Sequence, residues 1–516
     1  MPNTFNSRQF VLGALFAGLA GVGFAQESAL PDMNEIVAAY QSGDFETARE
    51  GLRILAEQEG SALSHYRYGR ILYEGLGGPQ DLTQAAEHLE MAVAQHHLEA
   101  AVLLGKLYLE NGTEDTLSRA VSLLSNGAAR GNSDAQYLMS ELYVQGYGVE
   151  QNSETALTWL MASAEQGHPV AQFDLSRYFA NGIGTAPDQA AAFEWLSQSA
   201  ENGYARAQYF MGVNYENGTS VPPNAAQAIV WFQRAAESGD ALAQRVLGTK
   251  YLTGDGIPEN PDEALRLLTL AAEAGEPGAQ SNLGYLYSTG TIVDADPEQA
   301  FLWYERAAAA GLTRAALALA TFYETGTGIE QDLKEAALLY QEVFSAGDDT
   351  GGARLGAMIA TGTVPDDVHV IDPMLMVYLA ANAGSDDAVN WMLERVDLGD
   401  MRATAMLATH YLDHAQNLDE AIPLLEQAAL YNNGTAQMRL GELYTTGTGV
   451  PLDMVMAYKW LNLAATFGRD EAREKRDLLT QLMTPEQIAE AQSLTRAHLA
   501  NDQPMPPDTD QTVDVQ

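Results

Sequence analysis

Glycine recurs at an interval of 36 residues through the middle of this chain, and that interval constrains the fold more than any other feature. Seven glycines keep it over six consecutive steps: Gly131, Gly167, Gly203, Gly239, Gly275, Gly311 and Gly347. Tryptophan follows the same spacing at Trp159, Trp195 and Trp231. A fixed period of this length indicates stacked supersecondary units, each burying its apolar face against its neighbours. The chain is therefore predicted to be a repeat protein.

Each repeat is predicted to contain two α-helices. In the repeat that begins near Ala207, apolar and small residues follow one another at helical spacing as far as Tyr215. A turn such as Gly146-Tyr147-Gly148 then ends the first helix, because glycine adopts positive φ without strain. The second helix carries the tryptophan and an Ala-Ala pair that lets helices approach closely. We therefore expect an all-α solenoid of stacked antiparallel helix pairs.

The fullest copy of the pattern lies at residues 433–468. It contains Ala436, Leu440-Gly441, Tyr444, Gly447-Thr448-Gly449-Val450, Ala457, Trp460, Ala464-Ala465 and Gly468. This pattern resembles the Sel-one-like repeat (SLR) family, relatives of the tetratricopeptide repeats, and the resemblance covers about residues 61–468. It implies a right-handed superhelical solenoid with a concave groove, and adaptor roles in signalling or envelope assembly. Family members associated with β-lactam hydrolysis are rich in cysteine, whereas this chain has none.

Departures from the period suggest the organisation of the chain. Residues 1–25 carry one charge, Arg8, and an apolar stretch that ends at Ala25 before Gln26. This pattern predicts a cleaved signal peptide and therefore a periplasmic or secreted protein. The alternative is an uncleaved membrane anchor. The expected segments after it are a linker with a capping helix pair (26–60), eight regular repeats (61–347), irregular repeats (348–432), the last regular repeat (433–468), C-terminal capping helices (469–500) and a disordered acidic tail (501–516).

The charge of the chain limits its partners. It has 27 basic and 69 acidic residues, which gives a formal net charge of −42. Such a surface repels phosphate groups, so we expect no nucleic-acid binding. No segment after residue 25 is apolar enough to span a membrane, so we also expect no stable membrane insertion after signal cleavage. The expected partner is a neutral or basic protein or peptide. Alternatively, the acidic residues only keep a long exposed solenoid in solution.

Motifs that would indicate catalysis are absent from the sequence. It contains no Gly-x-Ser-x-Gly, His-Glu-x-x-His or Ser-x-x-Lys, and the repeated Gly-x-Gly is a turn between helices rather than a phosphate loop. His410 and His414 have the spacing of a shared metal site, but His414 falls where a turn glycine belongs. We therefore predict a chain that is not an enzyme and that needs no cofactor or metal.

One position offers a candidate binding surface. Glutamine occupies it in five consecutive repeats, at Gln136, Gln172, Gln208, Gln244 and Gln280, and Tyr137, Phe173 and Tyr209 follow the first three. By analogy with tetratricopeptide solenoids, the first helices line the groove, where carboxamides could hold the backbone of an extended peptide and the aromatic rings could pack on its side chains. Alternatively, each glutamine bonds to the backbone of a neighbouring repeat.

Three functions remain open at this point. The first is a non-catalytic scaffold of the cell envelope that binds a partner protein or peptide in its groove. The second is a glycan-binding factor in polysaccharide export or wall remodelling, with exposed aromatic rings such as Tyr137 and Tyr209 stacking on sugars. The third is a hydrolase that uses dispersed carboxylates, although no particular pair is indicated.

Overall fold

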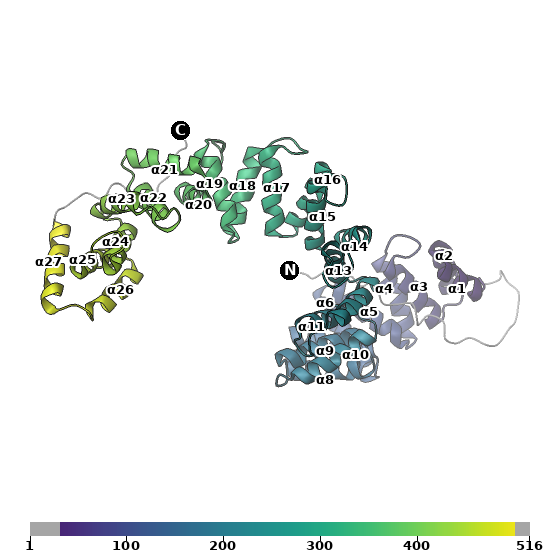
Figure 1. Cartoon of the computed structure of the whole chain (residues 1–516). Coiled ribbons are helices and arrows are strands. Elements are labelled where there is room, and N and C mark those ends of the chain that lie inside the picture. The colour runs from purple at the N-terminus through teal and green to yellow at the C-terminus, as the bar shows by residue number, and fades with distance from the viewer. Residues whose placement is uncertain (1–30, 501–516) are drawn as a thin grey trace, which may run out of the picture. The chain divides into compact units, whose positions relative to one another are not determined.

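The structure is a computed structural model that describes residues 31–500, and every regular element in this range is an α-helix (Figure 1). Up to residue 253 the helices are α1 (Met33–Ser42), α2 (Phe45–Gln58), α3 (Ala62–Glu74), α4 (Leu82–Ala94), α5 (Leu98–Asn111), α6 (Glu114–Ala129), α7 (Ser133–Gln145), α8 (Ser153–Glu165), α9 (Pro169–Asn181), α10 (Gln189–Glu201), α11 (Ala205–Asn217), α12 (Ala225–Glu237) and α13 (Ala241–Thr253).

The remaining helices are α14 (Pro261–Glu273), α15 (Pro277–Thr289), α16 (Pro297–Ala309), α17 (Thr313–Thr325), α18 (Leu333–Ser345), α19 (Asp349–Ala360), α20 (Pro373–Asn382), α21 (Asp386–Asp397), α22 (Met401–Asp413), α23 (Leu418–Leu430), α24 (Gly434–Thr446), α25 (Met454–Thr466), α26 (Asp470–Thr480) and α27 (Pro485–Ala500). The all-α repeat solenoid predicted from the sequence is confirmed. The predicted signal peptide (1–25) and acidic tail (501–516) lie outside the described residues.

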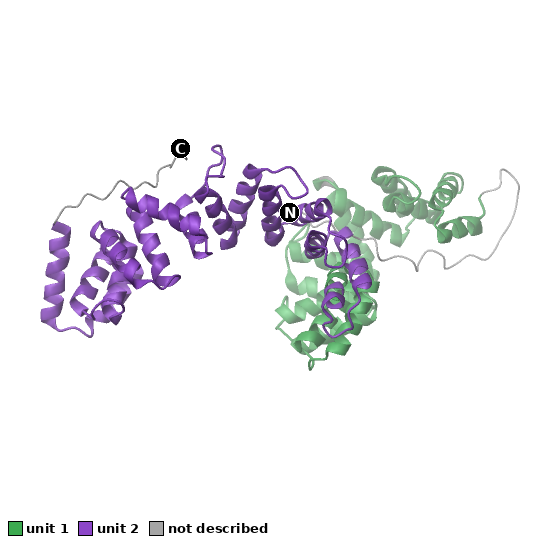
Figure 2. Cartoon of the chain, turned by 45° about the horizontal axis from the view of Figure 1, so that its top comes forward, with its two compact units in different colours: residues 1–247 green, residues 248–516 purple. Residues whose placement is uncertain are grey.

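The chain divides into two compact units, Met1–Leu247 and Gly248–Gln516, and the boundary falls inside α13 (Figure 2). In unit 1, each helix from α2 to α11 packs against the helix before it and the helix after it in the chain. Alternate helices also meet where both are first helices of their repeats, as α3 meets α5 and α5 meets α7. Elements on the inner side of a curved stack lie closer together, so the first helices form the inner face within this unit.

The ends of the helices follow from their capping residues. The first helix α7 ends at Gly146, whose φ of 68° is left-handed, so the predicted glycine turn is present. The second helix α8 begins after Asn152, whose side-chain oxygen accepts a hydrogen bond from the backbone N–H of Thr155. Because the same caps recur in the regular repeats, the ends of each helix are specified locally.

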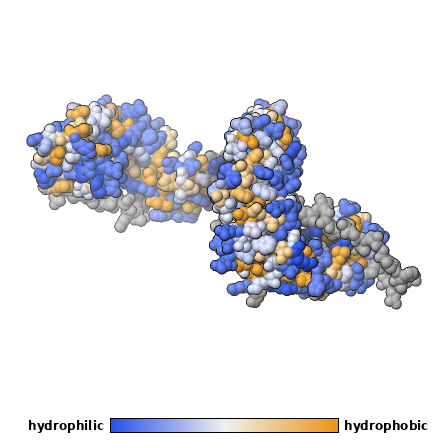
Figure 3. Space-filling view, turned by 90° about the horizontal axis from the view of Figure 1, so that it is seen from below, coloured by the Kyte–Doolittle hydropathy of each residue, from blue (hydrophilic) through white to orange (hydrophobic). Residues whose placement is uncertain are grey.

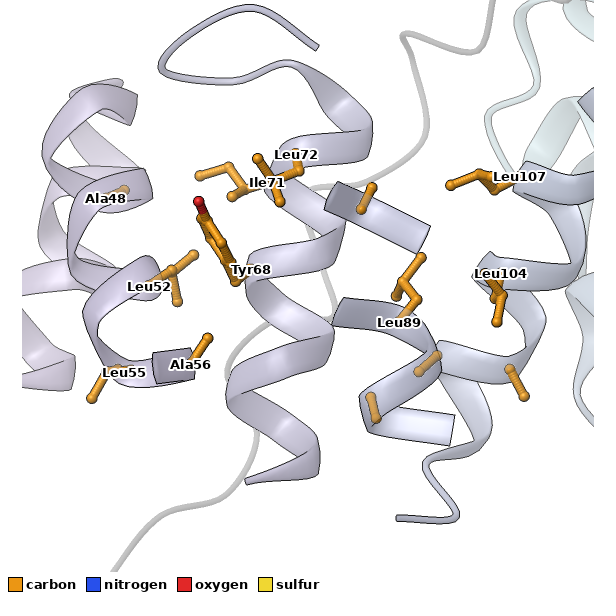
Figure 4. Close-up of a cluster of buried hydrophobic side chains, with 14 of the residues drawn as sticks. Ala48, Leu52, Leu55, Ala56, Tyr68, Ile71, Leu72, Leu89, Leu104 and Leu107 are labelled. Carbon is orange, nitrogen blue, oxygen red and sulfur yellow. The ribbon is translucent and has the colours of Figure 1, made fainter. Parts of the chain in front are cut away.

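Small residues determine how closely the two helices of a repeat approach. A Cβ placed on Gly212 of α11 would lie 2.5 Å from Cε1 of Phe232, a fully buried ring of α12. Glycine at this position therefore leaves the space that the partner ring fills. Figure 4 shows the same kind of packing near the N-terminus, where Leu52 of α2, Tyr68 of α3 and Leu89 of α4 fill the space between successive helices.

Two stretches depart from the regular pair. Within 348–432 the helices number five, because α21 stands between the pair α19–α20 and the pair α22–α23. This extra helix accounts for the lengthened spacing in the sequence, and it contacts α19, α20 and α22. In the second stretch, α5 and α6 are joined by only two residues, Gly112 and Thr113, whereas a regular repeat such as α7–α8 has seven.

The face seen in Figure 3 is largely hydrophilic, with hydrophobic residues in separate patches. None of the helices between residues 31 and 500 combines the length and the hydrophobicity needed to cross a membrane.

Candidate partner-binding face

The repeated glutamines are buried between repeats. Each Nε2 donates a hydrogen bond to the backbone carbonyl eight residues earlier, near the C-terminal end of the preceding second helix, at 3.0 to 3.2 Å. The exposed fractions of these residues lie between 0 and 7%. The residues with this bond are Gln136, Gln172, Gln208, Gln244, Gln280 and, in the last regular repeat, Gln437.

A second bond completes the environment of two of these side chains. The Oε1 atom of Gln136 accepts a hydrogen bond from Gln166, and that of Gln172 accepts one from Asn202. The five glutamines from Gln136 to Gln280 therefore do not form a row of exposed carboxamides. Their geometry matches the alternative interpretation, in which this residue joins one repeat to the backbone of the preceding one.

The aromatic residues next to the glutamines are half-buried, and they lie on the first helices α7, α9 and α11. The ring of Phe173 contacts the ring of Phe210 with centroids 5.6 Å apart, which joins α9 to α11. The ring of Tyr209 makes an edge contact with Phe210 at 5.3 Å. On α7, the ring of Tyr137 stacks on His168 at 5.2 Å. Contacts between aromatic rings thus link neighbouring first helices.

Two carboxylates lie within this aromatic surface. The hydroxyl of Tyr137 donates to Oδ2 of Asp174 at 3.0 Å, and Arg177 donates to Oδ1 of Asp174 at 3.3 Å. Glu141 stands one turn after Tyr137 on α7 and makes no hydrogen bond or ion pair within the described part of the chain. We call the set Tyr137, Glu141, Phe173, Asp174 and Phe210 the acid–aromatic face.

Burial changes the protonation of this face. It raises the pKa of Glu141 to about 7, and the nearby charge of Asp174 adds to the rise while Arg177 opposes it. Burial also raises the pKa of Asp174, against the lowering effect of Tyr137 and Arg177. A cation that reached either carboxylate would relieve this cost, because an opposite charge favours the ionised form of an acid.

The repeat geometry explains why these residues meet. Glu141 follows Tyr137 by four residues and so lies on the same side of α7. Phe173 and Tyr209 stand 36 and 72 residues after Tyr137, at the same position in the next two repeats. The sequence analysis identified Tyr137, Phe173 and Tyr209 but missed Glu141, Asp174 and Phe210. The signal available was that these three residues share the solvent-facing side of the first helices.

The histidine pair considered as a metal site has another environment. Nδ1 of His410 lies 2.9 Å from Oδ1 of Asn382, and the ring of His410 stacks on His414 with centroids 6.1 Å apart. His414 is the residue after the end of α22, as its place in the repeat suggested. Between residues 31 and 500, no three side chains of His, Cys, Asp or Glu are grouped so that they could hold a metal ion.

Comparison with solved structures finds other SLR proteins. A protective antigen present in uropathogenic Escherichia coli strains and displaying an SLR fold is 27% identical, with a TM-score of 0.50, over 88% of this chain and 94% of that one. A Sel1 repeat protein from Oxalobacter formigenes is 30% identical, with a TM-score of 0.42, over 47% of this chain and 96% of that one. Comparison with curated proteins finds no match.

The model of one repeat family matches more than half of the chain. It is described as the Sel1 repeat and matches residues 62–97, 133–168, 169–204, 205–240, 241–276, 277–312, 313–348 and 434–466. The unmatched stretches between these copies are the repeat with the two-residue turn and the segment that contains α21. The resemblance inferred from the sequence is confirmed, and the chain belongs to the Sel1 repeat family.

Proposed function

We propose that this protein is a non-catalytic scaffold of the bacterial cell envelope that binds a basic segment of a partner protein on its acid–aromatic face. The Sel1 repeat fold is generally a protein-interaction fold, which supports the class of function. The apolar stretch at residues 10–24 supports export, and the antigen of Escherichia coli is a bacterial protein of similar fold. The adaptor role and the partner are the proposed part.

One observation carries the proposal. Glu141 and Asp174 are held half-buried beside the rings of Tyr137, Phe173 and Phe210, and Phe210 is still 38% exposed. A lysine or arginine side chain suits such a surface, because its apolar stem packs on rings while its charge pairs with a carboxylate. The net charge of −42 would also draw a basic segment toward the chain.

The experiment measures binding of a fluorescein-labelled peptide of alternating lysine and phenylalanine by fluorescence anisotropy. The test variant carries Glu141→Gln and Asp174→Gln, and the control carries Glu154→Gln and Glu194→Gln on the exposed sides of α8 and α10. At about pH 8, above the raised pKa of Glu141, the two variants lose nearly the same charge, so they separate a local site from general attraction. We expect the test variant to bind about ten-fold more weakly than the control.

Equal affinities of the two variants would refute the acid–aromatic face as the binding site. A peptide of alternating glutamate and phenylalanine that binds as well as the basic peptide would refute the charge preference. Binding of a neutral oligosaccharide that is insensitive to salt and is lost in a Phe210→Ala variant would instead support the glycan-binding alternative.

A further inference from the structure

A groove of about 490 Å³ lies between α4, α5 and the start of α6 in unit 1. Its apolar lining includes Leu82, Ala86 and Leu107. The charged residues that line it are Glu87 and Glu90, and both are acidic. The groove is separate from the acid–aromatic face, since the two share no residue.

The two-residue turn of this repeat explains why the groove is open. In the regular repeats, the seven-residue turn after the first helix folds back onto the preceding second helix. An aliphatic residue of the turn then packs into the core cluster of that helix; the residues that do this are Leu76, Val149, Ile183, Ile329 and Val450. The turn Gly112-Thr113 is too short to provide such a residue.

The last regular repeat shows which surface has been left uncovered. There, a Cβ on Gly449 would lie 2.6 Å from Cδ1 of Ile422 and 3.3 Å from Cδ1 of Leu418, the fifth and first residues of α23. The first and fifth residues of α4 are Leu82 and Ala86, and both line the groove. Because alanine replaces isoleucine at the fifth position, the surface there is also hollowed.

We propose that this groove binds an extended segment of a partner protein that presents one valine or isoleucine side chain with a lysine or arginine beside it. The chain itself supplies the evidence for the aliphatic side chain, since its own turns place such a residue on the equivalent surface of other repeats. The evidence for the basic neighbour is the charge of Glu87, which lines the groove and forms no ion pair within the described part of the chain, whereas Glu90 already pairs with Arg119 at 3.0 Å.

The probe for this site is a fluorescein-labelled peptide, Lys-Gly-Thr-Gly-Val-Lys, which copies the turn at residues 447–450 between two lysines. The test variant is Ala86→Phe in the full chain, which fills the groove. Phenylalanine is compatible with this position, because Phe193 and Phe301 are the fifth residues of α10 and α16. We expect the variant to unfold at the same temperature as the original chain and to bind the peptide at least about ten-fold more weakly.

Three further measurements make the result specific. Replacing valine by serine in the peptide should weaken binding to a similar extent, and the change Glu87→Lys should weaken binding of the original peptide. The variant with Glu141→Gln and Asp174→Gln should bind this peptide normally, so the proposal can fail or succeed independently of the proposed function. Binding of the peptide that is unchanged by Ala86→Phe would overturn the proposal. So would the finding that the original chain is a dimer and that Ala86→Phe dissociates it, because a second copy of the chain would then fill the groove.

Discussion

The buried glutamine is the residue that most clearly links one repeat to the next. Its Nε2 atom binds a carbonyl at the end of the preceding second helix, where the last carbonyls of a helix lack partners within the helix. Gln172 is 3% exposed and also receives a hydrogen bond from Asn202. The side chain therefore satisfies a buried backbone carbonyl of Ala164 and also accepts a hydrogen bond from the exposed amide of Asn202.

Replacing Gln172 by alanine should lower the free energy of unfolding by about 1 to 3 kcal/mol, because Ala164 and Asn202 would each lose a partner. Urea denaturation followed by circular dichroism measures the change, and the exposed Gln227→Ala on α12 is the control. Binding of the basic peptide should stay within a factor of about two of the original value. If the Gln172→Ala variant is as stable as the original chain but binds the basic peptide more weakly, the glutamine contacts the partner instead.

At the level of helices, both helices of a repeat contribute to the core, whereas the acid–aromatic face is built from first helices. The acid–aromatic face combines α7, α9 and α11, and no single one of these helices contains it. Its two carboxylates come from neighbouring repeats, Glu141 from α7 and Asp174 from α9. Because burial raises the pKa of both carboxyls, and the charge of Asp174 adds to the rise at Glu141, both prefer the protonated form more than an exposed acid does.

This preference predicts a pH dependence of binding. The pKa of Glu141 is raised to about 7, whereas a bound cation favours its ionised form. The affinity for the lysine–phenylalanine peptide should therefore increase by about ten-fold between about pH 5.5 and about pH 8, a change that corresponds to a pKa shift of about one unit. The variant Glu141→Gln should remove most of this increase, and an equally steep profile in that variant would contradict the assignment.

The same group predicts how stability depends on pH. Because the pKa of Glu141 is raised in the folded chain from its ordinary value of 4.5 to about 7, the folded state holds this proton more tightly than the unfolded state. The free energy of unfolding should therefore fall by about 1 to 3 kcal/mol as the pH rises through this interval. Urea denaturation of the Glu141→Gln variant should show a smaller decrease; an identical decrease would exclude Glu141 as its source.

At the scale of the whole molecule, the excess of acidic residues governs how partners approach. The formal charge of −42 comes from 69 acidic and 27 basic residues along the chain, so acidic side chains outnumber basic ones more than two to one. Such a field accelerates the approach of basic segments, whereas the acid–aromatic face and the groove beside α4 supply the specific contacts. Long-range attraction and local contact should therefore respond differently to salt.

Raising the salt concentration from about 0.02 to about 0.3 M should lower the association rate of the lysine–phenylalanine peptide by about ten-fold, while its dissociation rate changes much less. Stopped-flow anisotropy measures both rates. The variant with Glu154→Gln and Glu194→Gln should show nearly the same salt dependence, because it removes only two of the acidic residues. An association rate that does not depend on salt would contradict electrostatic attraction by the chain.

The sequence by itself determined the repeat, the class of fold and the ends of the helices. These follow from local information, namely the 36-residue spacing of glycine, the apolar spacing within each helix, and capping residues such as Asn152 and Gly146. The spacing alone did not show that the stretch 348–432 contains the single helix α21 between two helix pairs. That α21 is a single helix without a second helix of its own can be seen only when the helices are placed next to one another in space.

The tertiary structure decided which side chains are available for binding. A glutamine that recurs every 36 residues has the same sequence pattern whether it faces solvent or a neighbouring backbone, and only the stacking of repeats placed Gln172 in the interior. The meeting of Tyr137 with Asp174, 37 residues apart, depends on the same stacking. The groove beside α4 exists because the short turn of one repeat leaves the second helix of the preceding repeat uncovered. Which surface a turn covers depends on how neighbouring repeats pack against each other, so the length of the turn alone does not reveal the groove.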